Sequence, residues 1–145
     1  MGFIELEKRL RLLIDDKLLE FMEEILTELE PEIVRMNREQ LERGEKADGS
    51  FFQPYSWITI QWRAEAGNPV KNQLIALYDT GDFWAGFWAK AYNNKLSLFS
   101  DDVKTEMLVG IYGNNIFGLT QENFQALGGR VNPLLKQKAG QFLQQ

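Results

Sequence analysis

The 145-residue sequence contains neither cysteine nor histidine. Without cysteine there can be no disulfide, no thiolate nucleophile and no thiolate metal site. Without histidine the chain lacks the commonest general base, the commonest metal ligand and any Ser-His-Asp triad. A catalytic site would therefore have to be built from carboxylates, lysines, tyrosines and hydroxyl groups.

Long hydrophobic runs are also missing. Charged residues interrupt the apolar stretches, and none approaches the roughly 20 apolar residues that span a bilayer. The first residues, MGFIELEKRL, lack the basic start of a signal peptide. We therefore expect a soluble protein that is made in the cytoplasm and has no membrane partner.

Basic charge is scarce. The net charge is −5, and residues 1–32 hold ten acidic and four basic residues. Proteins that bind DNA or RNA need a basic patch or stripe to neutralise phosphates. We therefore expect no sequence-specific nucleic-acid partner.

What is present predicts a single α+β domain over the whole chain. Residues 4–29 carry apolar side chains at three- and four-residue steps, which is typical of a long helix. Pro31 suits the first turn of a second helix, and Gly44 suits its end. The predicted regions are N-terminal helices over 1–43, an aromatic α/β middle with a hairpin over 44–119, and C-terminal helices over 120–145.

Capping residues mark helix starts in the middle of the chain. Ser56 predicts the cap of a helix over 57–65. Thr80 is expected to cap a short helix over 81–85, and Gly81 to relieve crowding where that turn meets the next strand. We interpret Thr80 and Gly81 as a structural motif.

The segment FWAKAY-NN-KLSLFS predicts a β-hairpin, and Leu74–Tyr78 before it is expected to be extended. Asn93-Asn94 tolerates the positive φ angles that a tight turn demands. Alternation along the two arms predicts an apolar face with Phe87, Ala89, Ala91, Leu96 and Leu98, and a second face with Trp88, Lys90, Tyr92, Lys95, Ser97 and Phe99.

Two more helical segments are expected after the hairpin. Ser100 or Asp101 predicts the cap of a helix over 102–112. Thr120 predicts the cap of the last helical region. We expect Gly128-Gly129 and Pro133 to interrupt that region, because both weaken a helix interior.

Acidic residues offer the best material for chemistry. Carboxylates on facing elements could bind Mg²⁺ or act as an acid/base pair. The same residues flank expected helix starts, where the helix dipole favours negative charge. We adopt this second interpretation and predict no enzyme activity, no catalytic residue, no metal and no cofactor; the residues concerned are Asp79, Asp82, Asp101, Asp102 and Glu106.

Two features suggest an interface. All four tryptophans fall within residues 57–88, without the cationic groove that accompanies base stacking, and tryptophan is enriched in cores and interfaces. A helix over 4–29 is about 39 Å long, more than a domain of this size can cover. We predict interface residues at Leu10, Leu13, Phe21, Trp84 and Trp88.

Several segments between Asn37 and Leu127 resemble, in the same order, the phage virion morphogenesis family. This family comprises small tail-completion and head–tail joining proteins of tailed phages. The similar segments are Asp48-Gly49-Ser50-Phe51-Phe52, Pro54-Tyr55-Ser56-Trp57-Ile58-Thr59 with Arg63, Leu77-Tyr78-Asp79-Thr80-Gly81-Asp82-Phe83, and Phe117-Gly118-Leu119-Thr120-Gln121-Glu122-Asn123.

The resemblance implies a structural virion subunit, a neck or tail-completion ring protein that acts in head–tail joining. Its partners would be copies of itself and neighbouring virion proteins, and the isolated chain would assemble only weakly. Two alternatives stay open from the residues alone. One is a non-virion phage or prophage protein that regulates or inhibits a host protein, and the other is a carboxylate-dependent metal enzyme.

Overall fold

A computed structural model describes residues 2–70, 74–77, 81–92 and 95–144. The fold is mixed α+β, as the sequence predicts. In chain order the elements are α1 (Phe3–Glu28), α2 (Glu30–Glu42), α3 (Trp57–Glu65), α4 (Asp82–Ala85), β1 (Phe87–Tyr92), β2 (Lys95–Ser100), α5 (Thr105–Tyr112), the 3₁₀ helix η1 (Asn114–Ile116) and α6 (Gln121–Leu143).

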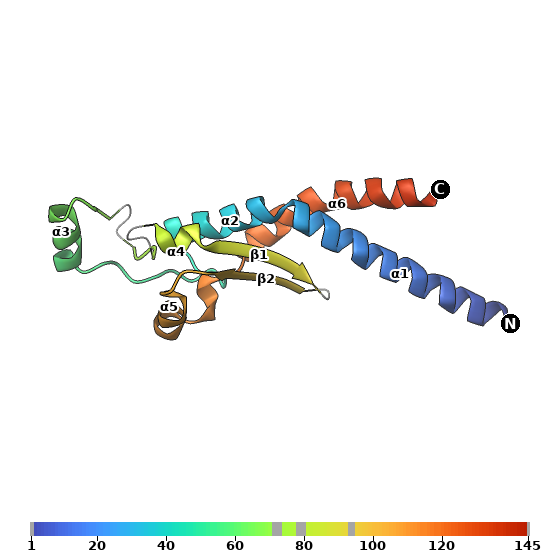
Figure 1. The fold of residues 1–145 in the computed structure, drawn as a ribbon, viewed down its shortest axis with the longest axis horizontal. Coiled ribbons are helices and arrows are strands. Elements are labelled where there is room, and N and C mark those ends of the chain that lie inside the picture. Colours follow the sequence, from blue (N-terminus) through green and yellow to red (C-terminus); the bar gives the residue numbers. More distant parts are fainter. Residues whose placement is uncertain (1, 71–73, 78–80, 93–94, 145) are drawn as a thin grey trace.

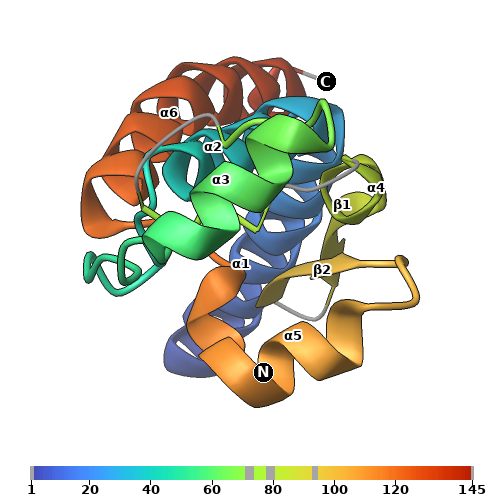
Figure 2. The same ribbon diagram turned by 90° about the vertical axis from the view of Figure 1, so that its left-hand side faces the viewer.

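The molecule is elongated, with an extension at each end (Figure 1). At one end α1 projects beyond the hairpin and splays away from α6. At the other end α3 lies away from the body. Seen from the α3 end, α6 and α5 lie on opposite sides of the body (Figure 2). The shape therefore offers surfaces for partners at both ends.

The core lies where α1, α2 and the apolar face of the hairpin meet. Ile25, Ile33 and Leu41 are fully buried there. The hairpin has the predicted antiparallel register, with Ala89 opposite Leu98. The predicted faces are therefore confirmed, whereas the Asn93-Asn94 turn lies outside the described residues.

Two buried amide side chains on α2 join it to the segment before α6. Asn37 Nδ2 donates to the Ile116 carbonyl at 3.1 Å, and the Gly118 N–H donates to Asn37 Oδ1 at 3.1 Å. Gln40 Nε2 donates to the Gly118 carbonyl at 2.9 Å, and the Thr120 N–H donates to Gln40 Oε1 at 3.0 Å. This amide clamp, Asn37 with Gln40, fixes where α6 begins.

The predicted helix caps at Ser56 and Thr120 are confirmed. The Ser56 hydroxyl accepts from the Thr59 N–H, and the Thr120 hydroxyl accepts from the Asn123 N–H, both at 3.2 Å. Each bond satisfies a donor that the first turn of a helix leaves without an intrahelical partner. Local capping chemistry was therefore a reliable guide to these two helix starts.

The expected start of α5 at residue 102 is wrong. The Asp102 N–H donates to Ser100 Oγ at 3.2 Å, and Asp102 Oδ1 accepts from the Lys104 N–H at 2.9 Å. Side chains that bond nearby backbone groups in this way compete with helix formation. The helix therefore begins only at Thr105.

Leu74–Leu77, the described part of the segment expected to be extended, forms no strand. Leu74 makes an isolated bridge with Pro54. Leu77 has a φ of 58°, a left-handed conformation that ends extended structure. The segment therefore joins the α3 excursion to the body instead of extending the sheet.

The expected interruption of the last helix is also wrong, because α6 continues through Gly128, Gly129 and Pro133 to Leu143. Packing against α1 holds the turns beyond the proline. Phe142 makes an edge contact with Phe21, with ring centroids 5.9 Å apart. Tertiary contact thus outweighs a local preference against helix.

Replacing the exposed Pro133 with alanine should raise the free energy of unfolding by about 1–3 kcal/mol. Proline lacks the N–H that would bond the Gly129 carbonyl inside α6, and alanine restores that donor. Denaturant unfolding measures the change, with Asn132→Ala as the control in the same helix. A gain for Pro133→Ala no larger than that of the control would contradict this explanation.

Candidate interaction surfaces

The N-terminal half of α1 forms an apolar arm, which we define as residues 3–16. The described side chains from 4 to 16 are exposed. Leu10 is 51 % and Leu13 62 % exposed, whereas Ile25 further along the same helix is fully buried. Figure 1 shows this arm lying clear of the other elements. A contiguous apolar surface of this kind usually marks an interaction site.

The second half of α1 is attached to α6 and is less available. Phe21 is half-buried against Phe142. Lys138 of α6 pairs with Glu24 at 3.1 Å and Glu28 at 3.6 Å. The hydrogen bond to Glu24 is the main cause that raises the pKa of Lys138. Among the predicted interface residues, Leu10 and Leu13 are therefore better placed than Phe21 to meet another chain.

A second apolar surface lies on α3. No residue of α3 is buried, and Trp57 is 72 % and Trp62 68 % exposed. Arg63 faces its own loop, where its Nε donates to the Asn68 carbonyl at 3.2 Å and its guanidinium lies 5.5 Å from the Tyr55 ring centroid. The helix thus turns its cationic side inward and its tryptophans outward.

Trp84 and Trp88 have different environments. Trp84 is only 9 % exposed, and its Nε1 donates to the Ala76 carbonyl at 3.1 Å. The structure therefore corrects its assignment as an interface residue, since it belongs to the core. Trp88 is half-buried on the outer face of the hairpin, where its Nε1 donates to Asp101 Oδ1 at 2.8 Å. With exposed Tyr92 and Phe99, Trp88 forms an aromatic face.

Gly81 stands at the start of α4 with a φ of 91°, in the left-handed region that favours glycine. Thr80, its expected capping neighbour, lies outside the described residues.

The acidic residues do not gather into a site in the part of the chain that the structure describes. Asp101 accepts from Trp88, and Asp102 caps the Lys104 N–H. No group of three or more acidic side chains there is arranged to hold a metal ion. Asp79 lies outside the described residues.

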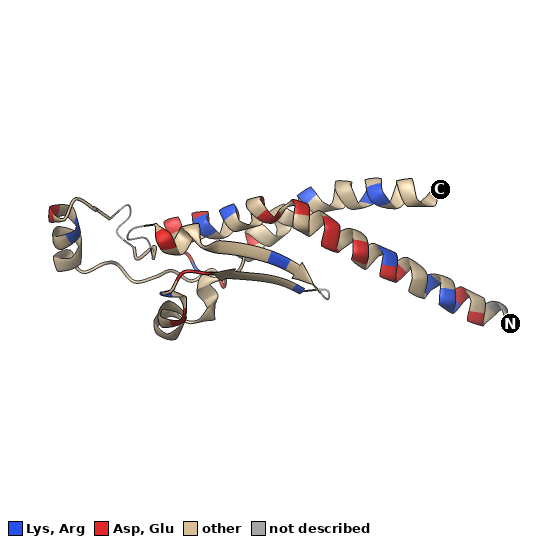
Figure 3. Ribbon diagram, viewed as in Figure 1, with Lys and Arg blue, Asp and Glu red and all other residues tan. Residues whose placement is uncertain are grey.

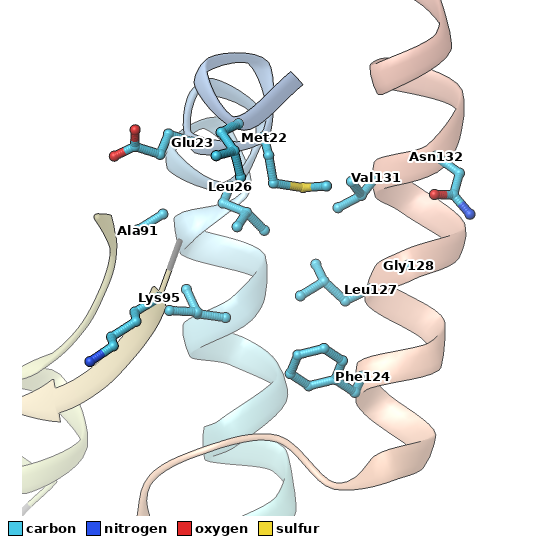
Figure 4. A pocket seen from close by; sticks show the side chains of 12 residues that line it. Met22, Glu23, Leu26, Ala91, Lys95, Phe124, Leu127, Gly128, Val131 and Asn132 are labelled. Atoms are coloured by element: carbon cyan, nitrogen blue, oxygen red, sulfur yellow. The ribbon is translucent and has the colours of Figure 1, made fainter. Parts of the chain in front are cut away.

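A groove lies between α1, the end of the hairpin and α6 (Figure 4). Its volume is about 330 Å³, and its walls are mainly apolar, with Leu26 facing Leu127 and Val131. Gly128 lines it without a side chain, and Lys95 lies at its hairpin side with its ammonium group directed away from the groove (Figure 4). Glu23 lines the side of the groove that α1 forms. All charged residues of α1 beyond Lys17 are acidic (Figure 3).

The chain matches no family model, no curated protein and no solved structure. Its surfaces are therefore the evidence from which a function can be proposed. Within the described residues, no helix is both long and apolar enough to cross a bilayer.

Three features were missed by the sequence analysis. The amide clamp was missed because glutamine and asparagine on a helix usually face solvent. The exposure of α3 was missed because tryptophan content favours a core and an interface equally. The groove was missed because α1, the hairpin and α6 are distant in sequence, although Gly128 on an otherwise apolar helix face was a signal.

Proposed function

We propose that the chain is a structural virion subunit of a tailed phage, a neck or tail-completion ring protein that acts in head–tail joining. It is made in the host cytoplasm, ends in the virion, and binds copies of itself and neighbouring virion proteins. It is not an enzyme and uses no cofactor.

The apolar arm of α1 carries the proposal. Fourteen residues of helix extend about 21 Å at 1.5 Å per residue, with Leu10 and Leu13 exposed along them. An arm of this kind gains apolar burial only from another chain. A second extension at the opposite end supports the same function, because a subunit within a ring has a neighbour on each side.

The segments that resemble the virion morphogenesis family have structural roles in this fold. Phe117–Asn123 contains the two backbone groups that Gln40 binds and the Thr120 cap of α6. Gly81 provides the left-handed residue that begins α4. These placements give the similar segments definite structural roles in this chain, whereas the family and the position in the particle rest on the resemblance alone.

Mass spectrometry of purified particles tests the function. We expect the chain in gradient-purified virions at several copies per particle, in a fixed ratio to a known neck or tail protein. A host protein recovered from the same lysate is the control for carry-over. A chain that is absent from particles but co-purifies with one host protein would favour the regulator or inhibitor alternative.

A further inference from the structure

Helix α3 has little hydrophobic support from the part of the chain that the structure describes. It has nine residues and buries none of them, although isolated helices shorter than about 12–15 residues are marginal in water. Ile58, Trp62 and Glu65 stand at positions i, i+4 and i+7, which places them on one face. Such a face is how an amphipathic helix presents anchors to a groove.

The groove between α1, the hairpin and α6 has the complementary character. It is apolar, it has the volume of a small ligand pocket, and exposed Leu19 and Phe124 extend its apolar lining. Lys95 is exposed beside it and forms no ion pair with a residue that the structure describes. Because α3 lies at the far end of the molecule from the hairpin tip, a chain does not fill its own groove (Figure 1).

We propose that α3 of one copy docks into this groove on the next copy. Trp62 enters between Leu26 and Leu127, and Ile58 packs beside it. The exposed Lys95 side chain turns from the outer face of the hairpin to pair with Glu65. Charge supports this occupant, because α3 has one outward charge, Glu65, for Lys95 at the rim of the groove. In the α1 arm of a second copy, Glu5 and Glu7 are already paired with Arg9 and Arg11, at 3.0 Å and 2.7 Å.

A contact in which the α3 end of one copy meets the groove at the other end of the next copy is heterologous. It leaves a free α3 and a free groove after each addition, so it produces a ring when the rotation closes and a filament when it does not. This inference names the contact between copies that the proposed function requires. It rests on the proposed function only because both require that the chain binds copies of itself.

Filling the groove tests the contact. A Cβ at Gly128 or at Gly129 would meet no other atom within 4 Å, yet only Gly128 lines the groove. We expect Gly128→Leu to weaken self-association of the full chain by at least about tenfold, as loss of an interface anchor does. Gly129→Leu, the matched control on the exposed side of α6, should self-associate like the wild type. Sedimentation velocity over a concentration series up to the millimolar range measures both.

Trp62→Ala should cause the same loss as Gly128→Leu, with an unchanged circular dichroism spectrum for the rest of the fold. Equal self-association of Gly128→Leu, Gly129→Leu and wild type would overturn the contact. So would a wild-type chain that stays monomeric over the whole range.

Cysteine cross-linking tests the geometry, because the natural chain has no thiol. Chains with Glu65→Cys and chains with Lys95→Cys are mixed and oxidised. We expect a heterodimer in clear excess over that formed by Glu65→Cys with Val103→Cys, a fully exposed position on the loop before α5. Equal yields for the two pairs would overturn the docking arrangement.

Failure of this contact is distinguishable from failure of the proposed function. If Gly128→Leu self-associates like the wild type and the wild-type chain is present in particles, the proposed function stands and the contact between copies lies elsewhere. If the groove variants block self-association but the chain is absent from particles, the contact stands and the virion role fails.

Discussion

Replacing Gln40 with methionine should lower the free energy of unfolding by about 2–5 kcal/mol. Methionine has nearly the same size, so packing around the fully buried position is retained. The Gly118 carbonyl and the Thr120 N–H, which now bond the Gln40 amide, would lose their partner. A buried polar group without a partner costs about 1–3 kcal/mol.

Denaturant unfolding followed by circular dichroism measures this loss. Gln125→Met is the matched control, because Gln125 is exposed on α6 and its replacement should change stability by less than about 0.5 kcal/mol. Hydrogen exchange at the Thr120 and Asn123 amides should also become faster, since Gln40 positions this segment. A loss below about 1 kcal/mol for Gln40→Met would show that the amide clamp is dispensable.

The elements with local signals were predictable from the sequence. Apolar spacing gave α1 and α2 to within about two residues, which is the usual ambiguity of helix ends. Strict alternation gave the hairpin register, because a shift by one residue would expose the whole apolar face. Ser56 and Thr120 gave two helix starts, because a capping hydroxyl bonds a backbone N–H three residues away.

Features that depend on distant parts of the chain were not predictable. Nothing local distinguishes Gln40, which is buried, from Gln125, which is exposed, since both are helical glutamines. Trp84 and Trp62 differ in the same way, because only the tertiary arrangement decides which tryptophan meets the core. Pro133 shows that packing can maintain a helix where propensity predicts a break.

The exposure of the expected interface residues was predictable in part. The excess length of the first helix pointed to Leu10 and Leu13, and both are exposed in the structure. The cluster of tryptophans, the second signal, led us to choose Trp84, which is in the core, and to omit Trp62, which is exposed. Periodicity reveals the apolar stripe of α1. How much of this stripe the rest of the chain covers depends on the length and direction of α6, which periodicity does not give.

Replacing Leu10 with glutamate should remove the chain from assembled particles or reduce its copy number by at least about tenfold. Leu10 lies on the apolar stripe of the α1 arm and is half-exposed in the single chain. A carboxylate buried there by a partner would have no counter-charge, which is costly in an apolar contact. In the free chain the substitution touches solvent alone, and glutamate is a good helix former, so the fold should persist.

Leu12→Glu is the matched control for this prediction. Leu12 is 64 % exposed, in the same arm and two residues away, which places it on nearly the opposite side of the helix. Both variants add the same charge to the same exposed helix. A difference in incorporation between them would therefore show which face of the arm binds a neighbour. Particles assembled with each variant in place of the wild type are purified, and the copy number is measured by mass spectrometry. Equal incorporation of the two variants would mean that the stripe through Leu10 and Leu13 does not bind a neighbour, and the assembly contact would then have to lie on α3 or the hairpin.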